Sequence, residues 1–331
     1  MHTQGPVRPS QARGYLIALG AAAILSTTAV IIRQLNLAYG MPALVLAFWR
    51  DLLVAATLVP LFAWLKPGLL RAPRTALPFL AGYGLVLALF NVLWTLSVTV
   101  NGAASATVLA YCSVAFAVIL GRVLLDEPLG PAKLLATVLC LGGCVLVAGA
   151  YRASAWRANP LGILTGSLSG LAYAAYSLLG RRAARLGLDP WTTLLYIFAI
   201  AAGFLLLFNA GGLLPGSARR PADLLWLGRS LPGWGLLALL AAGPTVAGFG
   251  LYLVSLVHLP SSVANLVVSL EPAFTAVLAY LVLGERLTPA QGTGALMILG
   301  GVGVLRLGEI LMPPAPAAPR PRRPLARPSG S

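Results

Sequence analysis

Long apolar runs alternate with short polar segments along almost the whole chain. Each run approaches or exceeds the roughly 20 residues that cross a ~30 Å hydrocarbon layer as a helix. Because unpaired backbone groups cannot face lipid, and no alternating ten-residue pattern indicates a barrel, we expect helices. The pattern predicts an all-α polytopic membrane protein with ten transmembrane helices, at residues 14–32, 42–64, 77–98, 103–125, 131–150, 160–179, 190–210, 232–256, 261–284 and 289–307.

The second half of this pattern repeats the first. Segment 101–150 matches 259–308 without a gap, so that Glu127 falls on Glu285, a spacing of 158 residues. Earlier in the two repeats the spacing is 148, and the extra residues fit the loop 211–231. A gap-free register indicates an internal duplication. Because an odd number of spans makes the second copy enter from the opposite side, we expect two inverted five-helix repeats, as in many secondary transporters.

The repeat also sets the expected organisation of the chain. A short cytoplasmic segment precedes the first repeat, a linker separates the two repeats, and a basic, proline-rich tail of the composition typical of disorder ends the chain. The expected parts are 1–13, 14–150, 151–159, 160–308 and 309–331.

Composition supports a membrane location and argues against nucleic acid as a partner. The chain is 59% hydrophobic and 9% charged, whereas soluble domains carry roughly 25% charged residues. The net charge of +15 comes from basic residues between the apolar runs or in the tail, which is typical of loops at membrane faces. Basic residues are more numerous on the side that holds both termini. We therefore expect a multi-pass protein of the inner or plasma membrane, with the lipid bilayer as a partner and both termini cytoplasmic.

Enzyme chemistry finds little support in the sequence. The chain has two histidines, and it lacks His-Glu-x-x-His, Gly-x-Ser-x-Gly and a nucleotide-binding glycine loop. We expect no cofactor, no metal and no direct use of ATP. Cys140 and Cys144 lie one turn apart in an apolar run and are interpreted as buried thiols. A non-transporting membrane scaffold or sensor stays open as an alternative, as does, with less support, an intramembrane enzyme.

Several short motifs carry a family resemblance. They are Phe48-Trp49-Arg50-Asp51, Ala172-Tyr173-Ala174-Ala175-Tyr176, Leu270-Glu271-Pro272-Ala273-Phe274, Leu283-Gly284-Glu285-Arg286-Leu287 and Leu299-Gly300-Gly301. With them, the chain resembles the EamA-type transporters of the drug/metabolite transporter superfamily over about 14–307. The resemblance implies two EamA-type repeats around a substrate cavity, and secondary transport, often efflux, of small metabolites or drugs. Leu25-Ser26 and Ser113-Val114 depart from the family pattern, so the substrate does not carry over.

Ionisable side chains inside the spans are expensive, at roughly 2.5–3.5 kcal/mol for Arg or Asp at a helix centre, and they are therefore candidates for function. Arg50 and Asp51 are sequence neighbours in the second span, and each is expected to find a partner on another helix. Arg50 either holds an anionic group of a substrate or belongs to a structural ion pair. Glu127 and Glu285 lie at matching helix ends, where we expect them to cap or pair locally.

Aromatic and amide side chains form a second group of candidates. Ser262, Asn265 and Ser269 follow one helical stripe, which must face a cavity or another helix because polar atoms at that depth need partners. For any single tyrosine, packing with its hydroxyl bonded to a neighbour is the simpler interpretation. Together with Arg50, the candidates for the substrate cavity are Asn91, Trp94, Tyr111, Tyr173, Tyr176, Tyr252, Asn265 and Ser269.

Glu271 is the candidate for coupling transport to an ion. It lies ten residues into its span, about 15 Å at 1.5 Å per residue, which is half of a ~30 Å core. A carboxylate at that depth could exchange a proton as access alternates, or it could serve only as a structural acceptor. Pro272 beside it and Pro244 in the preceding span are candidate hinges. The expected function is a secondary transporter, an exporter of amino-acid-like solutes or drugs. The coupling ion is a proton or another ion, and a homodimer stays open.

Overall fold

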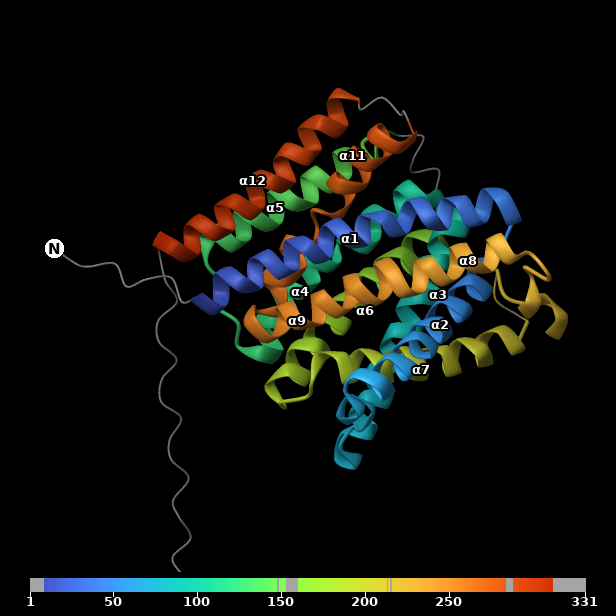
Figure 1. Ribbon diagram of the computed structural model, residues 1–331. Helices are drawn as coiled ribbons and strands as arrows, with labels where there is room; N and C mark the ends of the chain where they lie inside the picture. The colour runs from blue at the N-terminus through green and yellow to red at the C-terminus, as the bar shows by residue number, and fades with distance from the viewer. Residues whose placement is uncertain are drawn as a thin grey trace, which may run out of the picture.

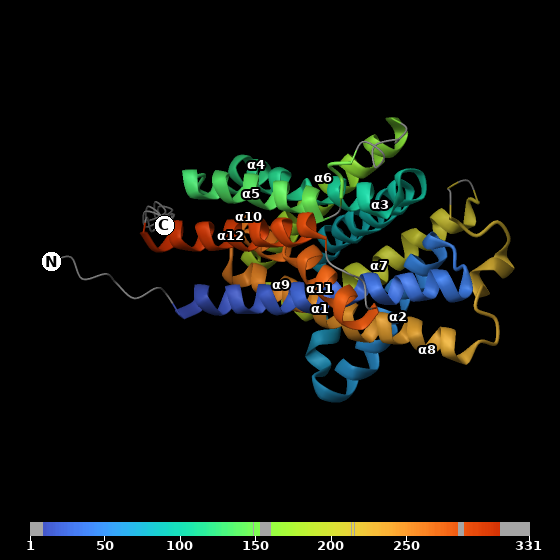
Figure 2. The same cartoon turned by 90° about the horizontal axis from the view of Figure 1, so that it is seen from above.

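The computed structural model describes residues 9–147, 149–152, 160–212, 214, 216–283 and 288–311. Within these residues the chain is a bundle of helices without a strand, which confirms the predicted all-α class (Figure 1). The start of α1 (Pro9–Tyr39) and the end of α12 (Pro289–Leu311) lie at the same end of the bundle in both views (Figures 1 and 2).

Proline marks the start of several helices, because a residue at the first helical position loses no backbone hydrogen bond. The helices between α1 and α12 are α2 (Ala43–Leu65), α3 (Leu77–Tyr111), α4 (Ser113–Leu125), α5 (Pro131–Val147), α6 (Pro160–Arg185), α7 (Pro190–Ala210), α8 (Leu231–Leu240), α9 (Gly250–His258), α10 (Ser261–Val268) and α11 (Glu271–Leu283). A π-helical segment, η5 (Ala241–Phe249), joins α8 to α9, and short 3₁₀ turns occur at η1 (Pro67–Leu70), η2 (Arg74–Ala76) and η4 (Pro221–Leu225).

Five helical segments of the described chain are long and apolar enough to cross a membrane by length and composition. They are Ala43–Leu65, Arg74–Trp94, Gly162–Arg185, Pro190–Ala210 and Leu231–His258. Leu109–Leu125, Pro131–Val147 and Pro289–Leu305 are shorter apolar helices. The described helices therefore support a polytopic membrane protein, and the full number of ten spans stays a prediction.

The boundary between the third and fourth expected spans differs from the prediction. The sequence predicted that helix ends at Val98 and restarts at Ala103, but α3 continues to Tyr111. A Cβ atom added to Gly166 would lie 2.6 Å from the Ser97 Oγ and 2.8 Å from the Leu109 Cβ, so these two side chains meet at one point. In a straight helix, twelve residues separate two positions by about 18 Å. The chain therefore reverses by bending within continuous helix.

Helices from the two halves of the chain pack against each other throughout the bundle. α3 packs along α6, α2 along α7, and α1 along α9 and η5. α5 and α12 form a side-by-side pair at one flank of the bundle (Figures 1 and 2). Most extensive contacts thus join an early helix to a late one, so neither half holds its own separate core.

Small residues make these close crossings possible. Ala18 and Ala22 are fully buried on α1. On α6, a Cβ added to Gly170 would lie 2.7 Å from the Leu109 carbonyl oxygen. A side chain at this position would hold the two backbones apart, so Gly170 serves packing of α6 against α3 within the chain.

Candidate functional site

Arg50, Asp51 and Asn91 form a closed polar triangle between α2 and α3. The Arg50 Nε donates to the Asp51 Oδ1 at 3.1 Å, and the Arg50 Nη2 donates to the Asn91 Oδ1 at 2.8 Å. The Asn91 Nδ2 donates in turn to the Asp51 Oδ2 at 3.0 Å. All three side chains are buried. Arg50 therefore faces protein, and its charge is balanced by Asp51, a geometry that favours the structural ion pair over an anion site.

Each of the two charged residues does find a partner on another helix, as the sequence predicted, since both bond Asn91 on α3. Arg50 and Asp51 also bond each other, which was not predicted. Neighbouring side chains leave a helix about 100° apart, but a long arginine can turn back along the helix surface to reach the next residue.

A second polar network joins four helices at the centre of the bundle. The Asn265 Nδ2 on α10 donates to the Ser177 Oγ on α6 at 2.9 Å, and the Tyr252 hydroxyl on α9 donates to the same oxygen at 2.6 Å. The Ser113 Oγ on α4 donates to the Asn265 Oδ1 at 3.3 Å. The stripe on α10 therefore faces other helices at Asn265, and Ser269 is fully buried with its hydroxyl bonded to the Leu266 carbonyl.

Ser113 and Ser177 belong to this network although the sequence analysis did not select either for it. Serine is frequent in membrane helices and often bonds its own backbone, as Ser177 does by donating to the Tyr173 carbonyl. A serine alone therefore gives no signal of a cross-helix bond.

A stack of tyrosines lies beside the second network. The ring of Tyr173 lies 6.0 Å from that of Tyr176 and 6.2 Å from that of Tyr252, all nearly parallel. Phe90 on α3 lies 5.1 Å from Tyr173 on its other side. Tyr176 and Tyr252 are fully buried, whereas Tyr173 is partly exposed, so Tyr173 forms the accessible edge of this stack.

Two helix breaks meet next to that accessible edge. α3 ends at Tyr111 and α4 begins at Ser113, while α10 ends at Val268 and α11 begins at Glu271. At the repeat spacing of 158 residues, Ser113 falls on Glu271, so the two breaks occupy matching positions. The Tyr111 hydroxyl and the Glu271 carboxyl are close neighbours in space. Both residues are partly exposed.

The two prolines predicted as hinges both lie at irregular points of the helices. Pro244 is buried inside η5, the π-helical segment between α8 and α9. There the Thr245 Oγ1 donates to the Leu240 carbonyl at 2.7 Å, which satisfies an acceptor in the irregular region. Pro272 is buried directly after the break between α10 and α11. A hinge function for either proline stays a prediction.

Glu127 caps a helix, but it is a distant one, so the predicted local role is wrong. Its carboxylate accepts from the amide of Ser261 at 2.8 Å and from the Ser261 Oγ at 2.7 Å, 134 positions along the chain. A carboxylate stabilises the positive end of whichever helix begins beside it, and spacing along the sequence does not identify that helix. Glu285, the matching residue, lies outside the described residues.

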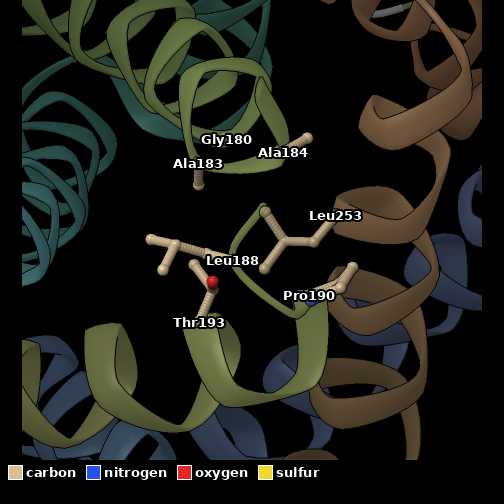
Figure 3. Close-up of a pocket in the computed structure, with 7 residues that line it drawn as sticks. All are labelled: Gly180, Ala183, Ala184, Leu188, Pro190, Thr193 and Leu253. Carbon is tan, nitrogen blue, oxygen red and sulfur yellow. The ribbon is translucent and has the colours of Figure 1, made fainter. Parts of the chain in front are cut away.

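The remaining candidates are less connected. Trp94 on α3 is partly exposed. Cys140 and Cys144 are buried free thiols, as predicted. A small pocket lies between α6, α7 and α9, and Figure 3 shows that it is lined almost entirely by apolar side chains. None of the predicted site residues lines this pocket, so it is not the centre of the candidate site.

Comparison with known proteins identifies the class that this fold and polar centre define. The model of the EamA-like transporter family matches residues 12–149 and again 160–307. The chain therefore belongs to the EamA-like transporter family, and it is a membrane transporter of the drug/metabolite transporter superfamily, as the motifs indicated.

The chain is also similar to two further proteins. The chain is 33% identical over 220 residues to "Uncharacterized protein PA1977" of Pseudomonas aeruginosa, which covers 62% of this chain and 67% of that protein. It also superposes on a crystal structure with a TM-score of 0.72 at 20% identity, covering 90% of this chain and 97% of the other. That likeness concerns the fold.

Proposed function

We propose that this protein is a secondary transporter that exports small organic solutes by alternating access. The moving parts are two inverted repeats, residues 14–150 and 160–308, joined by the linker 151–159. Both termini, with the segment 1–13 and the tail 309–331, lie in the cytoplasm, and the protein resides in the inner or plasma membrane. The substrates are amino-acid-like solutes or drugs.

The observation that carries the proposal is the meeting of the two helix breaks at Tyr111 and Glu271. Interrupted helices at matching positions of two repeats are the usual place for substrate and ion sites in secondary transporters, because the break leaves polar backbone groups free. Here the break of one repeat supplies a hydroxyl and the break of the other supplies a carboxyl. A movement of one repeat against the other changes the surroundings of both groups.

The substrate position is assigned to the partly exposed side chains around this meeting point. Tyr111 and Tyr173 offer aromatic faces and hydroxyls, and Glu271 offers a charge that changes when it takes up or releases a proton. Trp94 on α3 is a further partly exposed aromatic candidate. Arg50 and Asn91 act through the triangle that fixes α2 to α3, and Asn265 and Ser269 through the packing of α10. Pro244 and Pro272 are the hinges of this scheme.

A scaffold or sensor would need the same packed bundle but no titratable group at its centre. An ionisable side chain inside the membrane is expensive to maintain, and a purely structural site is served equally well by glutamine. The ionisable Glu271 inside its span therefore favours transport. No metal-binding group of His, Cys, Asp or Glu occurs in the part of the chain that the structure describes.

Transport is tested in proteoliposomes that contain the purified protein. Amino acids, nucleosides and cationic drugs are screened for uptake and counterflow, with and without a proton gradient. We expect uptake of one solute class to follow the gradient. Glu271→Gln should abolish that dependence while counterflow of the same solute persists, because exchange needs no net proton movement.

Asp189→Asn is the matched control. Asp189 is also a carboxylate, but it caps its own helix α7 by accepting from Trp191 and Thr192 amides at 2.9 and 3.1 Å. The Asp189→Asn variant should therefore keep proton-dependent uptake. A folded Glu271→Gln protein with full proton-dependent uptake would make Glu271 structural. No flux of any solute in either format would remove the transport proposal itself.

A further inference from the structure

Glu127, Lys133, Ser261 and Ser262 form a buried polar cluster, here named the clasp, at one end of the bundle. The Glu127 Oε1 accepts from the Ser261 amide at 2.8 Å and from the Ser261 hydroxyl at 2.7 Å. The Glu127 Oε2 accepts from the Ser262 amide at 3.3 Å and from the Ser262 hydroxyl. The Lys133 Nζ donates to the Ser262 Oγ at 2.9 Å. Both carboxylate oxygens are thus bound twice.

The clasp connects parts of the chain that belong to different family segments. Glu127 follows α4 and Lys133 lies in α5, both within the first segment, whereas the two serines begin α10 in the second. All four side chains are buried. Hydrogen bonds to an ionised carboxylate are among the strongest in proteins, and the start of a helix adds a favourable field. The start of α10 is therefore fixed firmly to the end of α4.

The end of α4 is shaped to present this carboxylate. Asp126 adopts a left-handed conformation with φ +53°, which turns the chain, and the Glu127 amide donates back to the Gly121 carbonyl at 3.0 Å. A Cβ added to Gly121 would lie 2.7 Å from the Glu127 Oε2, so only glycine leaves room for the carboxylate there. The backbone thus places the side chain before α10 meets it.

Arginines from α6 close the same end of the bundle next to the clasp. The Arg181 Nη1 donates to the carbonyls of Leu256 and Val257 at the end of α9, at 2.6 and 2.9 Å. The Arg185 Nη2 donates to the Leu125 carbonyl at the end of α4 at 3.3 Å. Positive charge at helix C-termini is favourable, so these residues reinforce the closed arrangement of α4, α9 and α10.

The matching positions at the opposite end cannot form an equal cluster. At the repeat spacing of 158 residues, Ser261 and Ser262 fall on Ala103 and Ala104, and Lys133 falls on Gln291. The alanines have no hydroxyl to donate, and the Gln291 Oε1 accepts from its own helix start at Thr288, at 2.9 Å. The sequence therefore places the hydroxyl and ammonium donors of the clasp in one repeat pairing and other residue types at the three matching positions.

We propose that the clasp is the gate that holds this end of the transport pathway closed, and that its opening is the costly step of each cycle. The inference rests on the proposed alternating-access function. Because the matching positions of the other repeat pairing carry no such donors, we expect the two access states to differ in stability, with the resting protein closed at the clasp. Charge distribution along the chain assigns this end to the cytoplasm.

The test measures access to a reporter behind the gate, so it needs no substrate. Val263 is 1% exposed and lies directly after the two serines on α10. Val263→Cys is placed in a protein whose three natural cysteines are replaced by alanine, and labelling by a membrane-impermeant maleimide is followed from each membrane face. Glu127→Gln should speed labelling from the clasp face at least about tenfold, a coupling of the usual size between two conformations. Labelling from the opposite face should not rise.

A second variant, Ser261→Ala with Ser262→Ala, keeps the charge but removes the hydroxyl donors, and it should produce the same one-sided increase. Adding Glu127→Gln to this double variant should raise the labelling rate little further, because all three substitutions disrupt the same contact between Glu127 and the start of α10. Asp189→Asn, a helix cap that joins no second helix, should leave the rate unchanged. Unchanged labelling in both clasp variants overturns the gate, and so does an equal increase from both faces.

The outcome separates the gate from the transport proposal. A one-sided increase in labelling supports the gate even if the proteoliposome screen finds no flux. Flux with unchanged labelling leaves the transporter standing without this gate.

Discussion

Replacing Asp51 by asparagine should destabilise the protein far more than the loss of a surface carboxylate does. Asp51 is fully buried and accepts from Arg50 and Asn91 at 3.1 and 3.0 Å. In the amide, one acceptor oxygen becomes an NH₂ group that faces a donor, so one bond is lost. The Arg50 guanidinium also keeps its charge in a buried site without a balancing carboxylate.

The two effects together should lower the free energy of unfolding by about 3–5 kcal/mol, the cost of removing one partner of a buried ion pair. Replacing both charges, with Arg50→Met and Asp51→Leu, should recover part of that loss, because no uncompensated charge remains although the buried Asn91 amide loses both partners. The control is Asp223→Asn. Asp223 accepts from the amides of Arg219 and Arg220, both at 2.9 Å, as a cap of η4, and its loss should cost about 1 kcal/mol.

Unfolding is followed in mixed micelles of increasing denaturing detergent, with helix content measured by circular dichroism. The reasoning is refuted if Asp51→Asn costs no more than Asp223→Asn. It is also refuted if the loss of unfolding free energy in the double variant equals the sum of the losses in Arg50→Met and Asp51→Leu alone, since the two charges would then not compensate each other.

Two further changes test the packing between the halves. Gly170→Leu should lower the free energy of unfolding by about 1–3 kcal/mol, because the new side chain would force the α3 carbonyls away from α6. Gly203→Ala should be nearly neutral, because a Cβ added there would have no neighbouring atom within 4 Å. Thermal unfolding of the two purified variants tests both expectations. Asn209→Leu should cost about 1–3 kcal/mol, because the buried amide bonds the Leu44 carbonyl at 3.2 Å and the Ala218 amide at 3.0 Å, and an unfolding midpoint equal to wild type would contradict this.

Much of the bundle could be predicted because the membrane imposes local rules. A spanning helix needs a long apolar run, and a polar interruption marks its end, so the order of helices is legible along the chain. The rule failed at 98–103, where the helix bends without ending. The matching stretch of the second half has Pro260 between α9 and α10, while the first half has no proline there. Without it, helical hydrogen bonding continues through the turn.

The sequence allowed residues of the candidate site to be selected, but it did not show which of them contact one another. Glu271, Tyr111 and Tyr173 could be selected because polar or aromatic groups inside a span call for an explanation. The partners of Ser177 and Glu127 could not be selected, since a serine or a helix-end carboxylate has many equivalent choices. Their partners are 88 and 134 positions away.

The sequence by itself determined the helical class and the duplication, because hydropathy and repeat spacing are properties of position along the chain. Tertiary structure decided that Arg50 is balanced by Asp51 and that Glu127 fixes the start of α10. It also decided that the break at Tyr111 meets the break at Glu271. A hydrogen bond depends on distances of about 3 Å and on exclusion of water, and both arise only when distant helix faces meet.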